Sequence, residues 1–144
     1  MADRREFRKE VRELVRELRG RTDALKISAR EYWLGPDPKL RALKASKLKS
    51  EIQSLSRHLR VLREVGISFD DQDLIEIRQL ATGAPFEERG WRRSAAVYDR
   101  ITDLSNSIEE LLEAIDISFY EIFPPHRRRN WWQVSIPVLL LFCL

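Results

Sequence analysis

Apolar residues of this chain recur at alternating spacings of three and four positions, and this periodicity constrains the fold more than any other feature. Such spacing places the apolar side chains on one face of an α-helix. The first run consists of Leu48, Ile52, Leu55, Leu59 and Leu62. The second consists of Tyr98, Ile101, Ser105, Ile108, Leu112, Ile115, Phe119 and Ile122, with Leu104 and Leu111 widening its apolar face. Because no long stretch alternates as a β-strand would, the sequence predicts an all-α protein.

Glycine and proline residues mark where the helices should begin and end. Gly35-Pro36 stops the first helix, and Asp37 followed by Pro38 is a typical start for the second. The expected helices span 3–34, 38–65, a short stretch from Asp70 or Asp71 to Gly83, and a last stretch from Phe86 or Trp91 to Phe123. The connections are short, so consecutive helices should pack antiparallel. We therefore expect one elongated antiparallel helical bundle over residues 1–126, with three long helices plus one short.

An apolar tail over residues 127–144 follows the bundle. It opens with a basic cluster and two tryptophans, Arg127, Arg128, Arg129, Trp131 and Trp132, and then becomes apolar up to Leu144. That order is typical of a helix entering a bilayer, with arginines at the anionic headgroups and tryptophans at the interface. The first 30 residues lack the apolar run of a signal peptide. These features predict that the bundle lies on the cytoplasmic face of the inner membrane.

The length of the tail leaves three arrangements open. The 14 residues from Trp131 to Leu144 would reach about 21 Å as a helix, whereas the hydrocarbon core of a bilayer is about 30 Å thick. The natural protein could continue beyond Leu144 and span the membrane, or the tail could enter one leaflet only. Alternatively the tail folds back onto the protein, because runs of about 10 to 14 apolar residues are often buried segments.

Charge is distributed unevenly along the chain. Residues 1–65 carry 18 Lys and Arg against 10 Asp and Glu, whereas residues 66–126 carry 5 against 13. The basic part and the acidic part can neutralise each other within one chain or between two chains, or each can have its own partner. Packing within one chain is the simplest of these explanations.

The first predicted helix separates its arginines from its glutamates. At about 100° per residue, five arginines share one stripe of the helix surface. This arginine stripe consists of Arg5, Arg8, Arg12, Arg16 and Arg19. A solvated surface explains such a stripe without any ligand. The alternative is that the arginines contact the phosphates of a membrane surface or of a nucleic acid.

No group of residues predicts catalysis or a bound metal. Asp70, Asp71 and Asp73 are placed as helix caps rather than as metal ligands. His58 and His126 have no second ligand at metal-binding spacing. The sequence also lacks a glycine-rich phosphate loop and an activated nucleophile. We therefore expect no cofactor, no metal and no enzymatic activity.

Two functional hypotheses remain. The first is a membrane-attached helical module that acts through protein–protein contacts, as a regulator, an adaptor or a membrane-acting component of a bacterial defence or toxin system. Its partner would be another protein or a second copy, with Leu48, Ile52, Leu55, Leu59 and Leu62 as the seam between copies. The second is a soluble basic helical protein that binds nucleic acid through its first two helices, with the tail buried in a dimer.

Overall fold

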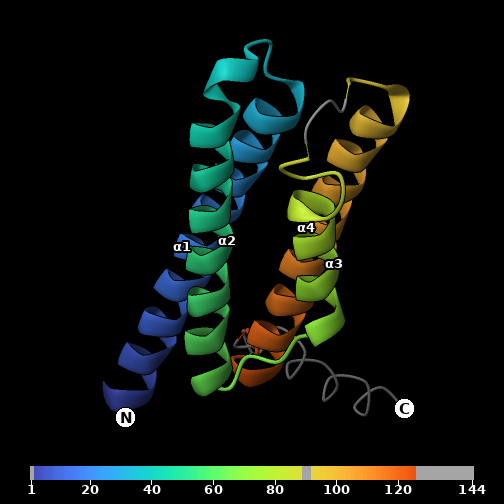
Figure 1. Cartoon of the computed structure of the whole chain (residues 1–144). Helices are drawn as coiled ribbons and strands as arrows, with labels where there is room; N and C mark the ends of the chain where they lie inside the picture. The colour runs from blue at the N-terminus through green and yellow to red at the C-terminus, as the bar shows by residue number, and fades with distance from the viewer. Residues whose placement is uncertain (1, 89–91, 126–144) are drawn as a thin grey trace, which may run out of the picture.

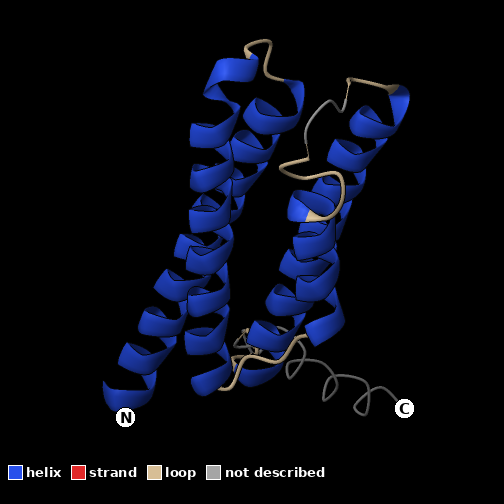
Figure 2. Ribbon diagram, viewed as in Figure 1, coloured by secondary structure: helices blue, strands red, loops and turns tan. Residues whose placement is uncertain are grey.

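The described part of the chain folds entirely into helices and loops (Figure 2). The computed structural model describes residues 2–88 and 92–125. Its elements are α1 (Ala2–Leu34), the short 3-10 helix η1 (Pro38–Leu40), α2 (Arg41–Glu64), α3 (Asp71–Thr82) and α4 (Ala95–Ile122). The all-α class is thus confirmed, with α1, α2 and α4 long and α3 short. The predicted apolar tail over 127–144 lies outside the described residues.

Each α-helix runs antiparallel to the next, and the four make an elongated bundle (Figure 1). α1 packs against α2 and α4, while α3 packs against α4 and α2. The first turns of α1 and the last turns of α4 therefore lie at the same end of the bundle. The rings of Phe7 and Phe123 meet there edge to face, with their centroids 5.7 Å apart. We call this the tail end, because the chain continues from Pro125 towards residues 127–144.

The helix ends follow from the residues that the sequence places there. The carboxylate of Asp37 accepts a hydrogen bond from the backbone N–H two residues later at 2.9 Å, and Asp70 does the same before α3 at 2.9 Å. After α2, Gly66 adopts a φ of 99°, a left-handed conformation that glycine reaches without strain. This turn lets the N–H of Ile67 donate to the carbonyl of Leu62 at 3.0 Å. Asp70 is thus confirmed as a helix cap, whereas Asp37 caps the 3-10 helix η1, and α2 itself begins at Arg41 without a side-chain cap.

The apolar seam of α2 lies in the core of the bundle. Its five side chains are between 0 and 5% exposed: Leu48, Ile52, Leu55, Leu59 and Leu62. From α1, the core receives Val11, Val15, Leu18, Leu25, Ala29, Tyr32 and Trp33. Other helices of the same chain therefore cover the predicted seam. A second copy could reach these side chains only if the bundle opened.

The last helix differs from its prediction in where it starts. α4 begins at Ala95, not at Phe86 or Trp91. Residues 83–88 instead form a turn, in which the N–H of Phe86 donates to the carbonyl of Gly83 at 2.9 Å. The Phe86 ring packs on Tyr32 at a centroid distance of 4.6 Å. This segment follows the end of α3 and packs on the last turn of α1, so its apolar residue reaches the core from a loop rather than from a helix face (Figure 1).

The apolar face of α4 is also rotated relative to the predicted one. Tyr98, the first member of the predicted run, is 54% exposed, and its neighbour Val97 is buried. Leu104 and Leu111 are 1% and 0% exposed and therefore lie at the centre of the buried face rather than beside it. The reason is that α4 packs against both α1 and α3, so it buries a wider face than a two-helix seam requires.

The end of the bundle opposite the tail end is closed by aromatic residues and one arginine. The indole N–H of Trp33 donates to the carbonyl of Ala81 at 3.0 Å, within the core. The guanidinium of Arg100 lies 4.7 Å from the Trp33 ring centroid and donates to the Leu80 carbonyl at 3.1 Å. Together with Phe86, these contacts tie α1, α3 and α4 together. Phe86 thus packs against the core from the segment that follows α3, and Trp91 lies outside the described residues.

Candidate interaction surfaces

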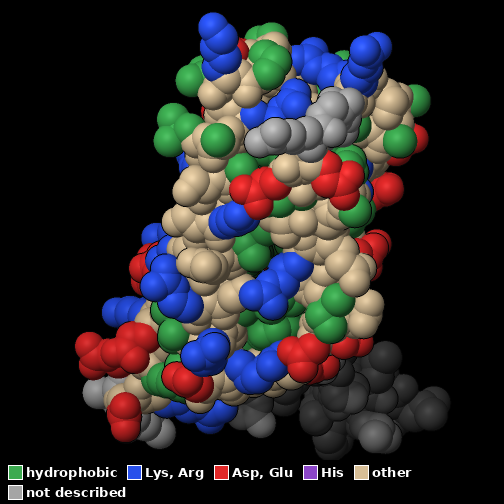
Figure 3. Space-filling model, viewed as in Figure 1, with side chains coloured by type: hydrophobic (Ala, Val, Ile, Leu, Met, Phe, Trp, Pro, Cys, Tyr) green, Lys and Arg blue, Asp and Glu red, His purple; other side chains and the backbone are tan. Residues whose placement is uncertain are grey.

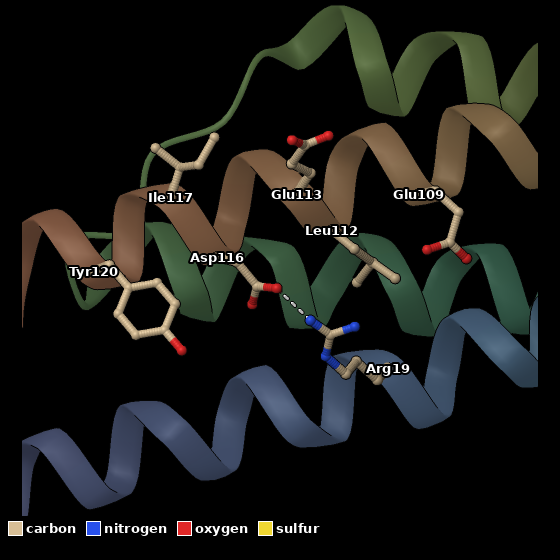
Figure 4. Close-up of a pocket in the computed structure, with 7 residues that line it drawn as sticks. All are labelled: Arg19, Glu109, Leu112, Glu113, Asp116, Ile117 and Tyr120. Atoms are coloured by element: carbon tan, nitrogen blue, oxygen red, sulfur yellow. Dashed lines mark hydrogen bonds and ion pairs between the residues drawn. The ribbon is translucent and has the colours of Figure 1, made fainter. Parts of the chain in front are cut away.

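Acidic residues of α4 face basic residues of α1 along the groove between the two helices. Arg19 forms an ion pair with Asp116 (Figure 4), and about two turns further along α1 Lys26 forms one with Glu109. The hydrogen bond and the positive charge of Lys26 lower the pKa of Glu109 below its ordinary value. A surface hollow of about 390 Å³ lies around Arg19 and Asp116 and is also bordered by Ile117 and Tyr120. We call this surface the α1–α4 groove.

The arginine stripe continues along α1 beyond the last acidic residue that α4 presents to it. Arg5, Arg12 and Arg19 are spaced by seven residues, which is close to two helical turns, so they share one side of α1. Arg19 is paired with Asp116, but the next residue of α4 along the groove is Tyr120, followed by the buried Phe123 at the tail end. Among the described residues, α4 therefore offers no acidic partner to the part of the stripe nearest the tail end.

The five arginines of the stripe consequently fall into two groups. Arg19 is paired across the groove, and Arg16 pairs with Glu13 on its own helix at 3.0 Å. Arg5, Arg8 and Arg12 form no ion pair with any described residue. Arg5 and Arg12 are exposed, whereas Arg8 is half-buried and its Nε has no hydrogen-bond partner within residues 2–88 and 92–125. The uncompensated part of the stripe is thus the part nearest the tail end.

Ion pairs between the basic and the acidic part of the sequence are a direct result of the packing. Four of them join residues 1–65 to residues 66–126: Arg19–Asp116, Lys26–Glu109, Lys49–Glu87 and Arg63–Asp71. Figure 3 shows acidic and basic side chains next to one another on one face, with hydrophobic side chains visible between the helix pairs. Packing within one chain therefore accounts for part of the charge asymmetry.

Raising the salt concentration should weaken the fold only slightly. The side chains of these four pairs are between 26% and 72% exposed, and exposed pairs contribute roughly 0.2–1 kcal/mol each. At about 0.5 kcal/mol for each of the four pairs, we expect the free energy of unfolding to fall by about 2 kcal/mol or less between low and high sodium chloride, as measured by urea denaturation. A larger loss would contradict the view that apolar packing holds the helices together.

Lowering the pH should remove the stabilisation that the Lys26–Glu109 pair gives to the fold. The pKa of Glu109 in the folded protein lies below its ordinary value of 4.5. The pair therefore stabilises the fold above that value, and its contribution disappears as the pH falls through the lowered pKa. Because the Glu109 side chain is 64% exposed, Glu109→Gln should change stability only a little at neutral pH and not at all once the carboxylate is protonated.

Exposed apolar side chains border the α1–α4 groove, and sequence periodicity did not single them out. Ile117 and Tyr120 of α4 are 53% and 56% exposed, and Ile27 of α1 is 57% exposed. Ile27 borders a second hollow of about 470 Å³ that is also lined by Lys26 and Ile101. In the sequence, each of these is an apolar residue at a position outside the periodic apolar face of its helix. Such residues on one groove, next to charged pairs, are typical of surfaces that contact other proteins.

The predicted membrane-interface residues cannot be placed on this framework. Arg127, Arg128, Arg129, Trp131 and Trp132 lie outside the described residues. Within residues 2–88 and 92–125, no helix is both long enough and apolar enough to cross a membrane. The same residues contain no group of three or more His, Cys, Asp or Glu side chains suited to hold a metal ion.

Comparisons with protein families, with curated proteins and with solved structures found no match to this chain.

Proposed function

We propose that this protein is a membrane-attached helical module whose bundle rests on an anionic membrane surface by its tail end and contacts another protein through the α1–α4 groove. The observation that carries the proposal is the position of the unpaired arginines. Arg5, Arg8 and Arg12 lack acidic partners among the described residues and lie towards the end from which the chain runs on to Arg127, Arg128 and Arg129.

Two weak attachments at one end of a molecule would support each other. Each Lys or Arg near an anionic membrane contributes about 1 kcal/mol, and a short apolar segment adds its buried hydrocarbon area. Neither alone gives firm attachment, but a polybasic surface beside an apolar segment does. The unpaired arginines of α1 and the basic-aromatic start of the tail supply these two elements from opposite ends of the sequence.

The protein contact is assigned to the α1–α4 groove because its apolar residues lie mostly outside the core. Ile27, Ile117 and Tyr120 are each more than half exposed, whereas the α2 seam is buried in the core. A partner that covers the groove would remove these side chains from water and would find the charged pairs of Arg19 and Lys26 at their border. The acidic side chains of α4 favour a partner with basic residues around an apolar centre.

Deletion of residues 127–144 tests the membrane part of the proposal. We expect the full chain to sediment with membranes and to resist carbonate extraction, and the shortened chain to remain soluble with unchanged helix content by circular dichroism. The core seams and the Phe7–Phe123 contact lie within the retained residues, so the bundle should fold without the tail. Recovery of the full chain in the soluble fraction without detergent would contradict the proposal.

The alternative function is nucleic-acid binding through the same unpaired arginines. Phosphates of a duplex would attract Arg5, Arg8 and Arg12 as lipid headgroups would. One sequence feature favours the membrane. The chain continues after Pro125 into a basic-aromatic segment, Arg127 to Arg129 with Trp131 and Trp132, and this order of residues is typical of a membrane interface rather than of a duplex contact. Side-by-side binding to vesicles and to a mixed-sequence duplex separates the two functions.

A further inference from the structure

A second basic site lies on the opposite side of α1, between α1 and α2. A pocket of about 220 Å³ is lined by Arg21 from α1 and by Ser54, Arg57, His58 and Val61 from α2. It is smaller than the pockets of roughly 300–1,000 Å³ that hold drug-sized ligands, so it suits a small chemical group. None of its residues belongs to the arginine stripe or to the α1–α4 groove.

The hydrogen bonds around His58 hold this pocket in a defined arrangement. A backbone carbonyl can only accept, so the Nε2–H of His58 donates to the Leu14 carbonyl, at 2.6 Å. In the neutral imidazole the Nδ1 atom then accepts, and Arg21 Nε donates to it at 3.2 Å. Arg21 Nη1 in turn donates to the hydroxyl of Ser54. His58 is only 6% exposed, so the ring and the guanidinium are fixed relative to each other.

The positive charge of the pocket is largely uncompensated. Arg21 is half-buried and is bonded to neutral groups, the His58 ring and the Ser54 hydroxyl. Neither Arg21 nor Arg57 forms an ion pair with a described carboxylate, and the Nη2 of Arg21 has no hydrogen-bond partner among the described residues. The nearest carboxylate to the ring is that of Glu17, 3.8 Å from His58 Nδ1 and 59% exposed.

We propose that this pocket binds a phosphate group through Arg21, Arg57 and the hydroxyl of Ser54, with His58 as the residue that positions Arg21. Guanidinium groups match the oxygens of a phosphate in charge and in geometry, and a hydroxyl adds one further donor. The group recognised is a phosphate monoester or free phosphate, the headgroup of an acidic lipid and inorganic phosphate being its two sources. The assignment stands on the pocket alone and does not depend on the tail entering a membrane.

Titration with inorganic phosphate tests the site, with the imidazole resonances of His58 as the signal. The chain has two histidines, so a His126→Gln variant assigns the spectrum. We expect a saturable shift of the His58 signals with phosphate and none with sodium chloride of equal ionic strength. Arg57→Gln should weaken binding roughly tenfold or more, because it removes a charge-assisted hydrogen bond to the phosphate. Arg57 is exposed, so its loss should leave the fold intact.

Matched variants separate a built site from general attraction of anions. Arg60→Gln removes the same charge from an exposed position of α2 that does not line the pocket, and it should change the affinity less than about twofold. Glu17→Gln should strengthen binding because it removes the carboxylate beside the ring, whereas Glu10→Gln, exposed on the same helix, should not. Equal effects of Arg57→Gln and Arg60→Gln, or no shift of His58 with phosphate, would overturn the proposal.

Vesicles distinguish the two sources of the phosphate group. We compare the binding of the wild type and of Arg57→Gln to vesicles that contain phosphatidic acid, a monoester, and to vesicles of equal charge that contain phosphatidylglycerol, a diester. If Arg57→Gln binds phosphatidic acid vesicles more weakly than the wild type does but binds phosphatidylglycerol vesicles equally well, the site takes a lipid headgroup. A phosphate-dependent shift of His58 without any preference among vesicles assigns it to free phosphate. Both outcomes support the pocket as a phosphate site.

Discussion

Leu55→Asp should abolish the cooperative thermal unfolding of this protein. Leu55 is 0% exposed in the core of the bundle. Removal of a buried leucine side chain costs about 2–5 kcal/mol, and burial of an unpaired carboxylate in its place costs several kcal/mol more. The total stability of a domain of this size is about 5–15 kcal/mol. We therefore expect most of the helical circular-dichroism signal to be lost at room temperature, where the wild type is folded.

Gln53→Asp is the matched control for this change. It introduces the same carboxylate two residues earlier in α2 at an exposed position, and surface substitutions of this kind usually change stability by less than about 0.5 kcal/mol. Unchanged helicity and melting temperature in Leu55→Asp would mean that α2 is not packed as described. A folded monomer that replaces a wild-type oligomer would instead assign the seam of Leu48 to Leu62 to a contact between copies.

The helices of this fold were predictable because their signals are local. Asp37 and Asp70 cap helices, and Gly66 ends one, through interactions with residues only a few positions away. The seam of α2 was equally plain from its spacing. The start of α4 was not predictable, because Phe86 is apolar for a reason that lies far away in the sequence, namely the Tyr32 ring that it covers. The exposure of Tyr98 likewise depends on how α4 packs against two neighbours.

The candidate surfaces show the same division between local and long-range information. Periodicity placed Arg5, Arg8, Arg12, Arg16 and Arg19 on one stripe, but only the packing of α4 separates Arg19, which is paired, from those without partners. The pocket around His58 was beyond sequence reasoning, because it joins α1 to α2 across 37 positions of the chain. An isolated histidine in a helix gives no indication of the arginine that will lie beside it.

Charge reversal of the three unpaired arginines should remove binding to anionic membranes. We expect the wild type to bind vesicles that contain phosphatidylglycerol with a steep inverse dependence on salt, because counterions are released and exposed charges are screened. Loss of three such arginines costs about 3 kcal/mol at about 1 kcal/mol each. The Arg5→Glu, Arg8→Glu, Arg12→Glu variant should therefore bind at least roughly 100-fold more weakly in vesicle sedimentation, and reversal of sign adds repulsion to that loss.

Two further variants make this result specific to the tail end. Lys39→Glu, Arg92→Glu, Arg93→Glu changes the net charge equally at exposed positions of the opposite end, and it should retain most of the binding. Arg5→Glu, Arg12→Glu changes only exposed side chains and avoids the half-buried Arg8, so a loss of binding there cannot stem from misfolding. If both triple variants lose binding equally, net charge rather than the tail end attracts the membrane. If the wild type prefers a mixed-sequence duplex to vesicles, the unpaired arginines serve nucleic-acid binding instead.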